Sequence, residues 1–136
     1  MAWLEFDRIR GEIALYKSGP PGDWGVAPSW IWPAHNETAK SSKGPWPPGI
    51  WGWSHYNAHV EAGLMPTCHP TKYGCFGIQV FTVPGRPGIG VHAGRTQGEP
   101  IAVGGRTLGC IRVPAAAMQT INEHHSTDQL LAIVVW

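Results

Sequence analysis

The 136-residue sequence has few charged side chains and no long apolar run. Charged residues make up 14% of the chain, against about 25% in a typical globular domain. The formal net charge is only +1, which excludes the broad basic surface that binds nucleic acid or an anionic membrane. No apolar stretch approaches the roughly 20 residues that a membrane-spanning helix needs. We therefore expect no nucleic-acid partner and no membrane span.

The N-terminus lacks the features of an export signal. Residues 1–7 contain no basic leader, no apolar core and no small-residue cleavage site. Three alternatives follow from this absence. The protein works in the cytoplasm, a leader has already been removed, or the protein is exported by a route other than general secretion.

Cysteine is scarce, and the count of three is odd. A local disulfide between Cys68 and Cys75 would suit an exported protein and would leave Cys110 as a thiol. The alternative is a zinc site in which Cys68, His69 and Cys75 combine with a nearby histidine. That spacing matches no standard zinc pattern. We expect the disulfide, and no metal or other cofactor.

Glycine, proline and tryptophan are abundant, with 18, 13 and 8 residues. This composition is typical of a turn-rich β domain and not of a disordered chain. The length predicts one domain over residues 1–136. Six tryptophans fall between Trp24 and Trp53, within a Pro/Gly-rich stretch over residues 17–53. They either anchor long loops in the core, which we favour, or form a surface that stacks on sugars.

Hydrophobic patterning predicts a mainly β fold with six or more short strands and one clear helix. Pro114 suits the first turn of that helix, because its missing N–H costs nothing there. A second, short helix is also expected within Ala58–Leu64, and His124 and His125 are expected on the solvated surface after the clear helix. The clearest strand segments are Trp3–Asp7, Glu12–Tyr16, Phe76–Val83, Gly88–His92 and Leu130–Trp136, and the clear helix covers Pro114–Asn122.

A histidine at a strand end and a Gly-Cys pair before the helix are the residues best suited to chemistry. A base beside Cys110 can hold its thiol as the nucleophilic thiolate, and His92 is that base. Gly109 lacks a Cβ, so the backbone can turn sharply there. If the amides of Gly109 and Cys110 point into one space, they form an oxyanion hole. Taken alone, Cys110 would more often be a small buried hydrophobic residue.

This pattern resembles the catalytic motif of L,D-transpeptidases of the YkuD type. In that family a histidine is followed, after a spacer in the mid-teens, by Ser/Thr-His-Gly-Cys-x-Arg/Asn. The matching positions here, after a spacer of fourteen residues, are His92, Thr107, Leu108, Gly109, Cys110 and Arg112. Glu12–Tyr16 resembles the family's early strand, and Gly-Pro-Trp-Pro-Pro-Gly at residues 44–49 resembles its proline-rich turn. The resemblance implies an L,D-transpeptidase-like β-sandwich with one short helix after the cysteine, and it leaves residues 17–53 outside as a Trp-rich insert.

The resemblance also implies an activity on the peptide stems of bacterial peptidoglycan. Cys110 would attack the carbonyl that joins diaminopimelate to the terminal D-Ala, with His92 as base and Gly109 in the oxyanion hole. The thioester would then pass to another stem, to a D-amino acid or to water. The substrate-binding candidates are Arg112, Thr107, Arg95, Arg106 and Tyr73. For Arg112 the alternative is a structural role as the partner in an ion pair.

The family's histidine before Gly-Cys is replaced here by Leu108. A compact branch of the family with another residue at this position includes antibacterial effectors, and this chain resembles that branch. The resemblance implies delivery by a dedicated secretion system and action in the periplasm or cell wall. It also implies a cognate immunity protein. The alternative from another functional class is a non-catalytic peptidoglycan-binding module that uses exposed tryptophans.

Overall fold

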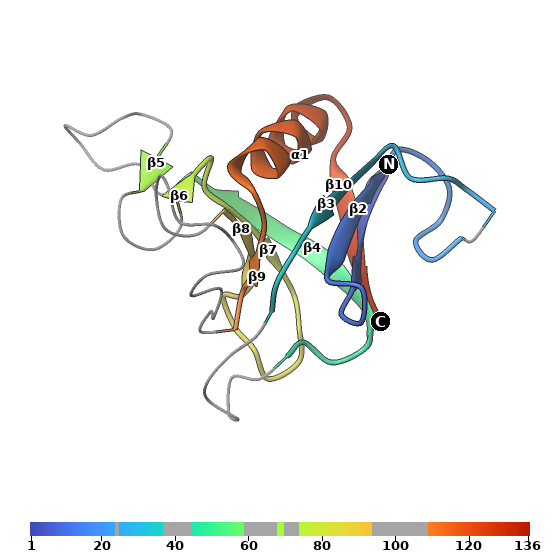
Figure 1. The fold of residues 1–136 in the computed structure, drawn as a ribbon, viewed down its shortest axis with the longest axis horizontal. Helices are drawn as coiled ribbons and strands as arrows, with labels where there is room; N and C mark the ends of the chain where they lie inside the picture. The colour runs from blue at the N-terminus through green and yellow to red at the C-terminus, as the bar shows by residue number, and fades with distance from the viewer. Residues whose placement is uncertain (24, 37–44, 59–67, 70–73, 94–108) are drawn as a thin grey trace.

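The computed structural model describes residues 1–23, 25–36, 45–58, 68–69, 74–93 and 109–136. Their main feature is one eight-stranded mixed sheet in the order β3-β2-β1-β10-β4-β7-β8-β9, accompanied by a two-stranded sheet, β5-β6 (Figure 1). The elements are β1 (Ala2–Asp7), β2 (Glu12–Tyr16), β3 (Trp30–Pro33), β4 (Gly49–Asn57), β5 (Cys68–His69), β6 (Gly74–Cys75), β7 (Ile78–Phe81), β8 (Gly90–His92), β9 (Ile111–Arg112), α1 (Ala115–Thr127) and β10 (Leu130–Val135). The prediction of a mainly β fold with one helix after Cys110 is confirmed. The described residues include no helix with the length and apolar character of a membrane span.

The strands at the two ends of the chain form the centre of one half of the sheet. β1 pairs in parallel with β10 and antiparallel with β2. Alternate residues such as Leu4 and Leu15 are buried in the core, as the period of two predicts. On the opposite face, the rings of Trp3 and Tyr16 stack with their centroids 3.9 Å apart.

The long strand β4 joins the two halves of the sheet. Its first residues pair with β10, and its last residues pair with β7, with a register shift between Trp53 and His55. Such an irregularity increases local twist and bends a strand. The layers expected of a sandwich therefore belong to one curled sheet (Figure 1).

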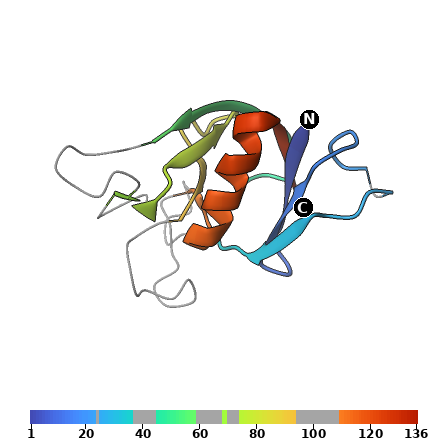
Figure 2. The ribbon, with the colours of Figure 1, turned by 90° about the horizontal axis from the view of Figure 1, so that it is seen from above.

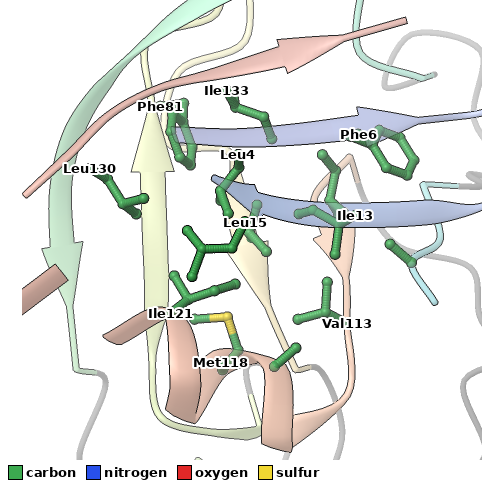
Figure 3. Close-up of a cluster of buried hydrophobic side chains, with 14 of the residues drawn as sticks. Leu4, Phe6, Ile13, Leu15, Phe81, Val113, Met118, Ile121, Leu130 and Ile133 are labelled. Atoms are coloured by element: carbon green, nitrogen blue, oxygen red, sulfur yellow. The ribbon is translucent and has the colours of Figure 1, made fainter. Parts of the chain in front are cut away.

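α1 lies across one side of the curled sheet (Figure 2). Its buried residues include Met118 and Ile121, which point toward Leu4 and Leu15 of the sheet (Figure 3). The helix begins one residue after Pro114 and continues to Thr127, beyond the predicted end at Asn122. The extra turn is polar, and within it only His124 and His125 are partly buried.

His124 and His125 lie within this last turn and not after the helix, so their predicted placement was wrong. The Nδ1 atom of His125 accepts the backbone N–H of Leu130 at 3.0 Å, and its ring packs 4.8 Å from Trp53 between centroids. Burial lowers the pKa of His125. The expected short helix within Ala58–Leu64 lies almost entirely outside the described residues.

The Trp-rich stretch contributes strands to the main sheet. β3 lies wholly within residues 17–53, and β4 begins there, so the segment is part of the main sheet. Trp46 is fully buried, and three other tryptophans of the stretch pack against the core: Trp32, Trp51 and Trp53. Trp30 is 37% exposed, and Trp24 lies outside the described residues. The core role that we favoured therefore describes most of this cluster.

The two edges of the sheet meet beside β9. The backbone of His35, just after β3, exchanges two hydrogen bonds with Arg112 of β9, at 2.8 and 2.9 Å. β3 and β9 are the opposite edge strands of the sheet. This contact closes the curled sheet at one point and brings the residues after β3 next to Cys110.

Candidate active site

Two short parallel strands bring the histidine and the cysteine to one edge of the sheet. β8 pairs with β9 so that Val91 lies opposite Ile111 and His92 lies opposite Arg112. Continuing this register by one residue places Cys110 opposite Gly90, and the Cys110 thiol makes a hydrogen bond with the Gly90 backbone. His92 is two residues further along the same strand. Because alternate side chains of a strand share a face, Cys110 and His92 belong to the same face of this pair.

The environment of Cys110 keeps its thiol protonated. Burial raises the pKa of Cys110, and the hydrogen bond with Gly90 lowers the pKa by a smaller amount. A thiol in this state needs a base before it can act as a nucleophile. His92 is only 7% exposed, and its carbonyl accepts the N–H of Val113 at 3.0 Å, which ties β8 to the chain that leads into α1.

The turn before Cys110 is held by two residues from the Trp-rich stretch. Gly109 has a φ of +129°, a conformation that favours glycine. The Nδ2 group of Asn36 donates to the carbonyls of Gly109 and Cys110, at 3.0 and 3.1 Å. The indole Nε1 of Trp46 also donates to the Gly109 carbonyl. We call Asn36 and Trp46 the carbonyl clamp.

No sequence pattern predicts this clamp, because Asn36 lies 74 residues from Cys110 and no spacing rule connects them. Trp46 belongs to the Gly-Pro-Trp-Pro-Pro-Gly segment, which the resemblance interpreted only as a turn. A tryptophan between two prolines is the hint that the sequence contains.

Arg112 is a buried residue that supports the backbone beside the site. Its side chain is 4% exposed, and its Nε donates to the carbonyl of Ala93 at 3.3 Å. Ala93 directly follows His92, so Arg112 fixes the chain at the end of β8. This hydrogen bond is a contact with the backbone, and both roles expected for Arg112, substrate binding and an ion pair, stay predictions.

Other predicted site residues lie outside the described part of the chain, namely Tyr73, Arg95, Arg106, Thr107 and Leu108. Cys75 is disulfide-bonded, and Cys110 is not part of a disulfide. The backbone of Cys68 lies directly opposite Cys75 in the β5-β6 pair, an arrangement in keeping with the predicted bond between them. In the part of the chain that the structure describes, no group of three or more His, Cys, Asp or Glu side chains is placed to hold a metal ion.

The described residues therefore form a curled mixed β-sheet in which His92 lies on β8 and Cys110 directly precedes the neighbouring strand β9. No protein-family model matches the sequence, and no curated protein matches it. The fold is similar to that of Bd1075 from Bdellovibrio bacteriovorus, with a TM-score of 0.67 and 14% sequence identity. The similarity covers 99% of this chain and 47% of Bd1075, so the chain spans about half the length of that protein. At this level of identity the comparison shows the fold alone.

Proposed function

We propose that the protein is a cysteine-dependent acyltransferase of the L,D-transpeptidase type that acts on peptidoglycan stem peptides. The observation that carries this proposal is the pairing of β8 with β9, which puts His92 and Cys110 on one edge and one face. Gly109, with its positive φ, directly precedes the thiol. The sequence pattern around these three residues supplies the substrate class by resemblance.

The reaction begins with proton transfer from Sγ of Cys110 to His92. The sulfur then attacks the carbonyl carbon between diaminopimelate and D-Ala, forming a C–S bond and a tetrahedral oxyanion. Backbone N–H groups at Gly109 and Cys110 stabilise this charge. The C–N bond breaks, D-Ala leaves with the proton from His92, and a thioester remains on Cys110.

Three acceptors are compatible with this thioester. An amine of a second stem gives a crosslink, a D-amino acid gives exchange, and water gives a shortened stem. In each case the acceptor loses a proton to His92, and the Cys110 thiol is regenerated. The proposal includes an effector role, in which the protein reaches the cell wall of a rival bacterium and a cognate immunity protein covers the His92–Cys110 site.

The activity is tested by incubating the protein with a disaccharide-tetrapeptide and measuring released D-Ala. We expect release by the wild type, none by Cys110→Ala and slower release by His92→Ala. Mass spectrometry of the remaining stem identifies the acceptor as water, a D-amino acid or a second stem. Equal D-Ala release by Cys110→Ala and the wild type would contradict the proposal.

The effector role needs a separate test. Directing the protein to the periplasm of a bacterium should reduce growth, and Cys110→Ala should abolish the effect. Equal toxicity of the two proteins would show that harm does not depend on acyl transfer.

A second candidate function is a non-catalytic peptidoglycan-binding module. Two observations favour it: burial raises the pKa of Cys110, and Trp30 is partly exposed on the edge strand β3. Sedimentation with purified peptidoglycan separates the two functions. Binding that survives Cys110→Ala but is lost in Trp30→Ala, with no release of D-Ala by the wild type, would support the module.

A further inference from the structure

We infer that the carbonyl clamp, Asn36 and Trp46, positions the backbone amide of Cys110 as an oxyanion-hole donor. In this account Asn36 is a positioning residue, since it acts through the peptide beside the nucleophile and does not touch the substrate. The inference rests on acyl transfer at Cys110, which is part of the proposed function. It does not depend on peptidoglycan being the substrate.

The peptide bond between Gly109 and Cys110 determines where the Cys110 N–H points. In a trans peptide the C=O and the following N–H point in opposite directions, and the described residues contain no cis peptide. The Gly109 carbonyl is directed at Asn36 and Trp46 by two hydrogen bonds. The N–H of Cys110 therefore points away from the clamp.

The clamp is a rigid support, because its own groups are fixed. Asn36 is 6% exposed, and its Oδ1 accepts the backbone N–H of Trp46 at 2.8 Å. This bond determines which end of the amide faces the Gly109 and Cys110 carbonyls. The Trp46 ring is fully buried and packs edge-on against Phe81, with centroids 6.2 Å apart. Neither donor can turn away without leaving a buried polar group unsatisfied.

The closure of the sheet explains why the clamp reaches this peptide. Because the backbone bridge between His35 and Arg112 is antiparallel, the chain that follows His35 runs beside the chain that precedes Arg112. Asn36 follows His35, and Cys110 lies two residues before Arg112. The clamp thus connects the backbone bridge that closes the sheet with the Cys110 amide, which would face the negative charge of the oxyanion.

Two small reagents separate oxyanion stabilisation from thiol reactivity. With p-nitrophenyl acetate, Sγ of Cys110 attacks the acetyl carbonyl, passes through a tetrahedral oxyanion, releases p-nitrophenolate and leaves an acetyl thioester. With iodoacetamide, the sulfur displaces iodide at a saturated carbon, and no carbonyl oxyanion forms. The ratio of the two rate constants is therefore a measure of the oxyanion hole.

We expect Asn36→Ala to lower the acetylation rate about 10- to 100-fold, because loss of an oxyanion-hole donor costs about 10²- to 10³-fold and the amide is displaced here without being removed. Trp46→Phe removes one clamp hydrogen bond but keeps an aromatic ring, so a loss of about 3- to 10-fold is expected on the same basis. Alkylation by iodoacetamide should stay within about twofold in both variants.

Asn122→Ala is the matched control, because it also removes an asparagine side chain that donates to a backbone carbonyl, that of Phe76. It should lower stability without changing the ratio of acetylation to alkylation. If Asn36→Ala fails to fold, Trp46→Phe carries the test.

If acetylation and alkylation slow by the same factor in the clamp variants, the clamp has only a structural role, and the inference is overturned. Unchanged acetylation in both variants, or no acetylation of the wild type, would also overturn it. A wild type that is acetylated in a clamp-dependent way but releases no D-Ala from a tetrapeptide would sustain the inference and contradict the peptidoglycan proposal.

Discussion

Two asparagines, Asn36 and Asn122, make the same kind of hydrogen bond in different parts of the molecule. Each donates its side-chain amide to the carbonyl of a residue with positive φ: Asn36 to Gly109, at +129°, and Asn122 to Phe76, at +72°. A side-chain amide thus holds an unusual backbone conformation in both places. Such conformations persist only when the surrounding structure fixes them.

The difference between the two sites lies in what they connect. Asn122 also accepts the Nε2 group of the buried Gln79, at 2.9 Å, and so ties α1 to β7. Asn36 instead donates to the carbonyl of Cys110, the one cysteine shown to be outside a disulfide. One asparagine therefore joins a helix to the sheet, whereas the other orients the backbone around a thiol. The comparison predicts that stability depends on Asn122 and chemistry on Asn36.

The largest effect is expected from Gly109→Ala, at the glycine whose carbonyl Asn36 holds. An alanine resists a φ of +129°, so the carbonyl should leave the clamp and the Cys110 amide should move. We expect acetylation of Cys110 by p-nitrophenyl acetate to fall at least about 100-fold, the cost of losing an oxyanion-hole donor.

Gly85→Ala is the control for this change. Gly85 also has a positive φ, +70°, and a Cβ there would meet no atom within 4 Å. It lies in the turn between β7 and β8, so its substitution should cost stability but leave acetylation close to that of the wild type. If Gly109→Ala and Gly85→Ala lose acetylation equally, the loss follows from substituting any glycine with positive φ and is not specific to Gly109.

On the structural side, Asn122→Ala should reduce the free energy of unfolding by about 1–3 kcal/mol, because Gln79 Nε2 loses its partner in a buried position. Urea unfolding of the variant measures this loss, and Glu123→Ala, at an exposed neighbouring position, is the control. A change no larger than that of the control would show that the Asn122 network does not stabilise the fold.

The pH dependence of alkylation reports on the environment of the Cys110 thiol. Because burial raises the pKa of Cys110, its alkylation rate should still be rising at pH values above about 8.5, the ordinary pKa of a cysteine. Measuring iodoacetamide alkylation from pH 6 to 10, with glutathione as reference, gives the midpoint. A midpoint at or below that of glutathione would contradict a buried, protonated thiol.

The smallest expected effect concerns His125 in the last turn of α1. Burial lowers its pKa in the folded state, whereas the unfolded chain binds a proton near the ordinary value of about 6.5. The neutral ring's contribution to stability is therefore complete above that value and is lost as the pH falls below it. The free energy of unfolding should drop less between pH 7 and pH 5 in His125→Gln than in the wild type. Identical slopes would exclude this contribution.

Much of the fold could be predicted because local patterns specify it. Glu12–Tyr16 forms β2 with the predicted bounds, and Ile13 and Leu15 share one face in the core as predicted. The apolar run from Leu130 forms β10. β3 and the start of β4 were missed, because proline, glycine and tryptophan around them gave turn signals. Trp51 and Trp53 do alternate toward the core, but Gly49 and Gly52 weaken the pattern.

The candidate site was predictable only in part, for a different reason. His92, Gly109 and Cys110 form a motif with a defined spacing. In the structure, β8, which carries His92, pairs with β9, which begins one residue after Cys110. Asn36 and Trp46 reach the site only because the curled sheet closes between His35 and Arg112. Such a contact depends on the curvature of the whole sheet, so no local sequence pattern predicts it.

Acyl transfer at Cys110 can be observed in the intact mass of the protein after a brief incubation with a disaccharide-tetrapeptide. We predict an adduct equal to the substrate minus D-Ala, located on Cys110, absent in Cys110→Ala and slower to form in His92→Ala. A folded, reduced wild type that gains no mass and leaves the tetrapeptide intact would contradict acyl transfer at Cys110.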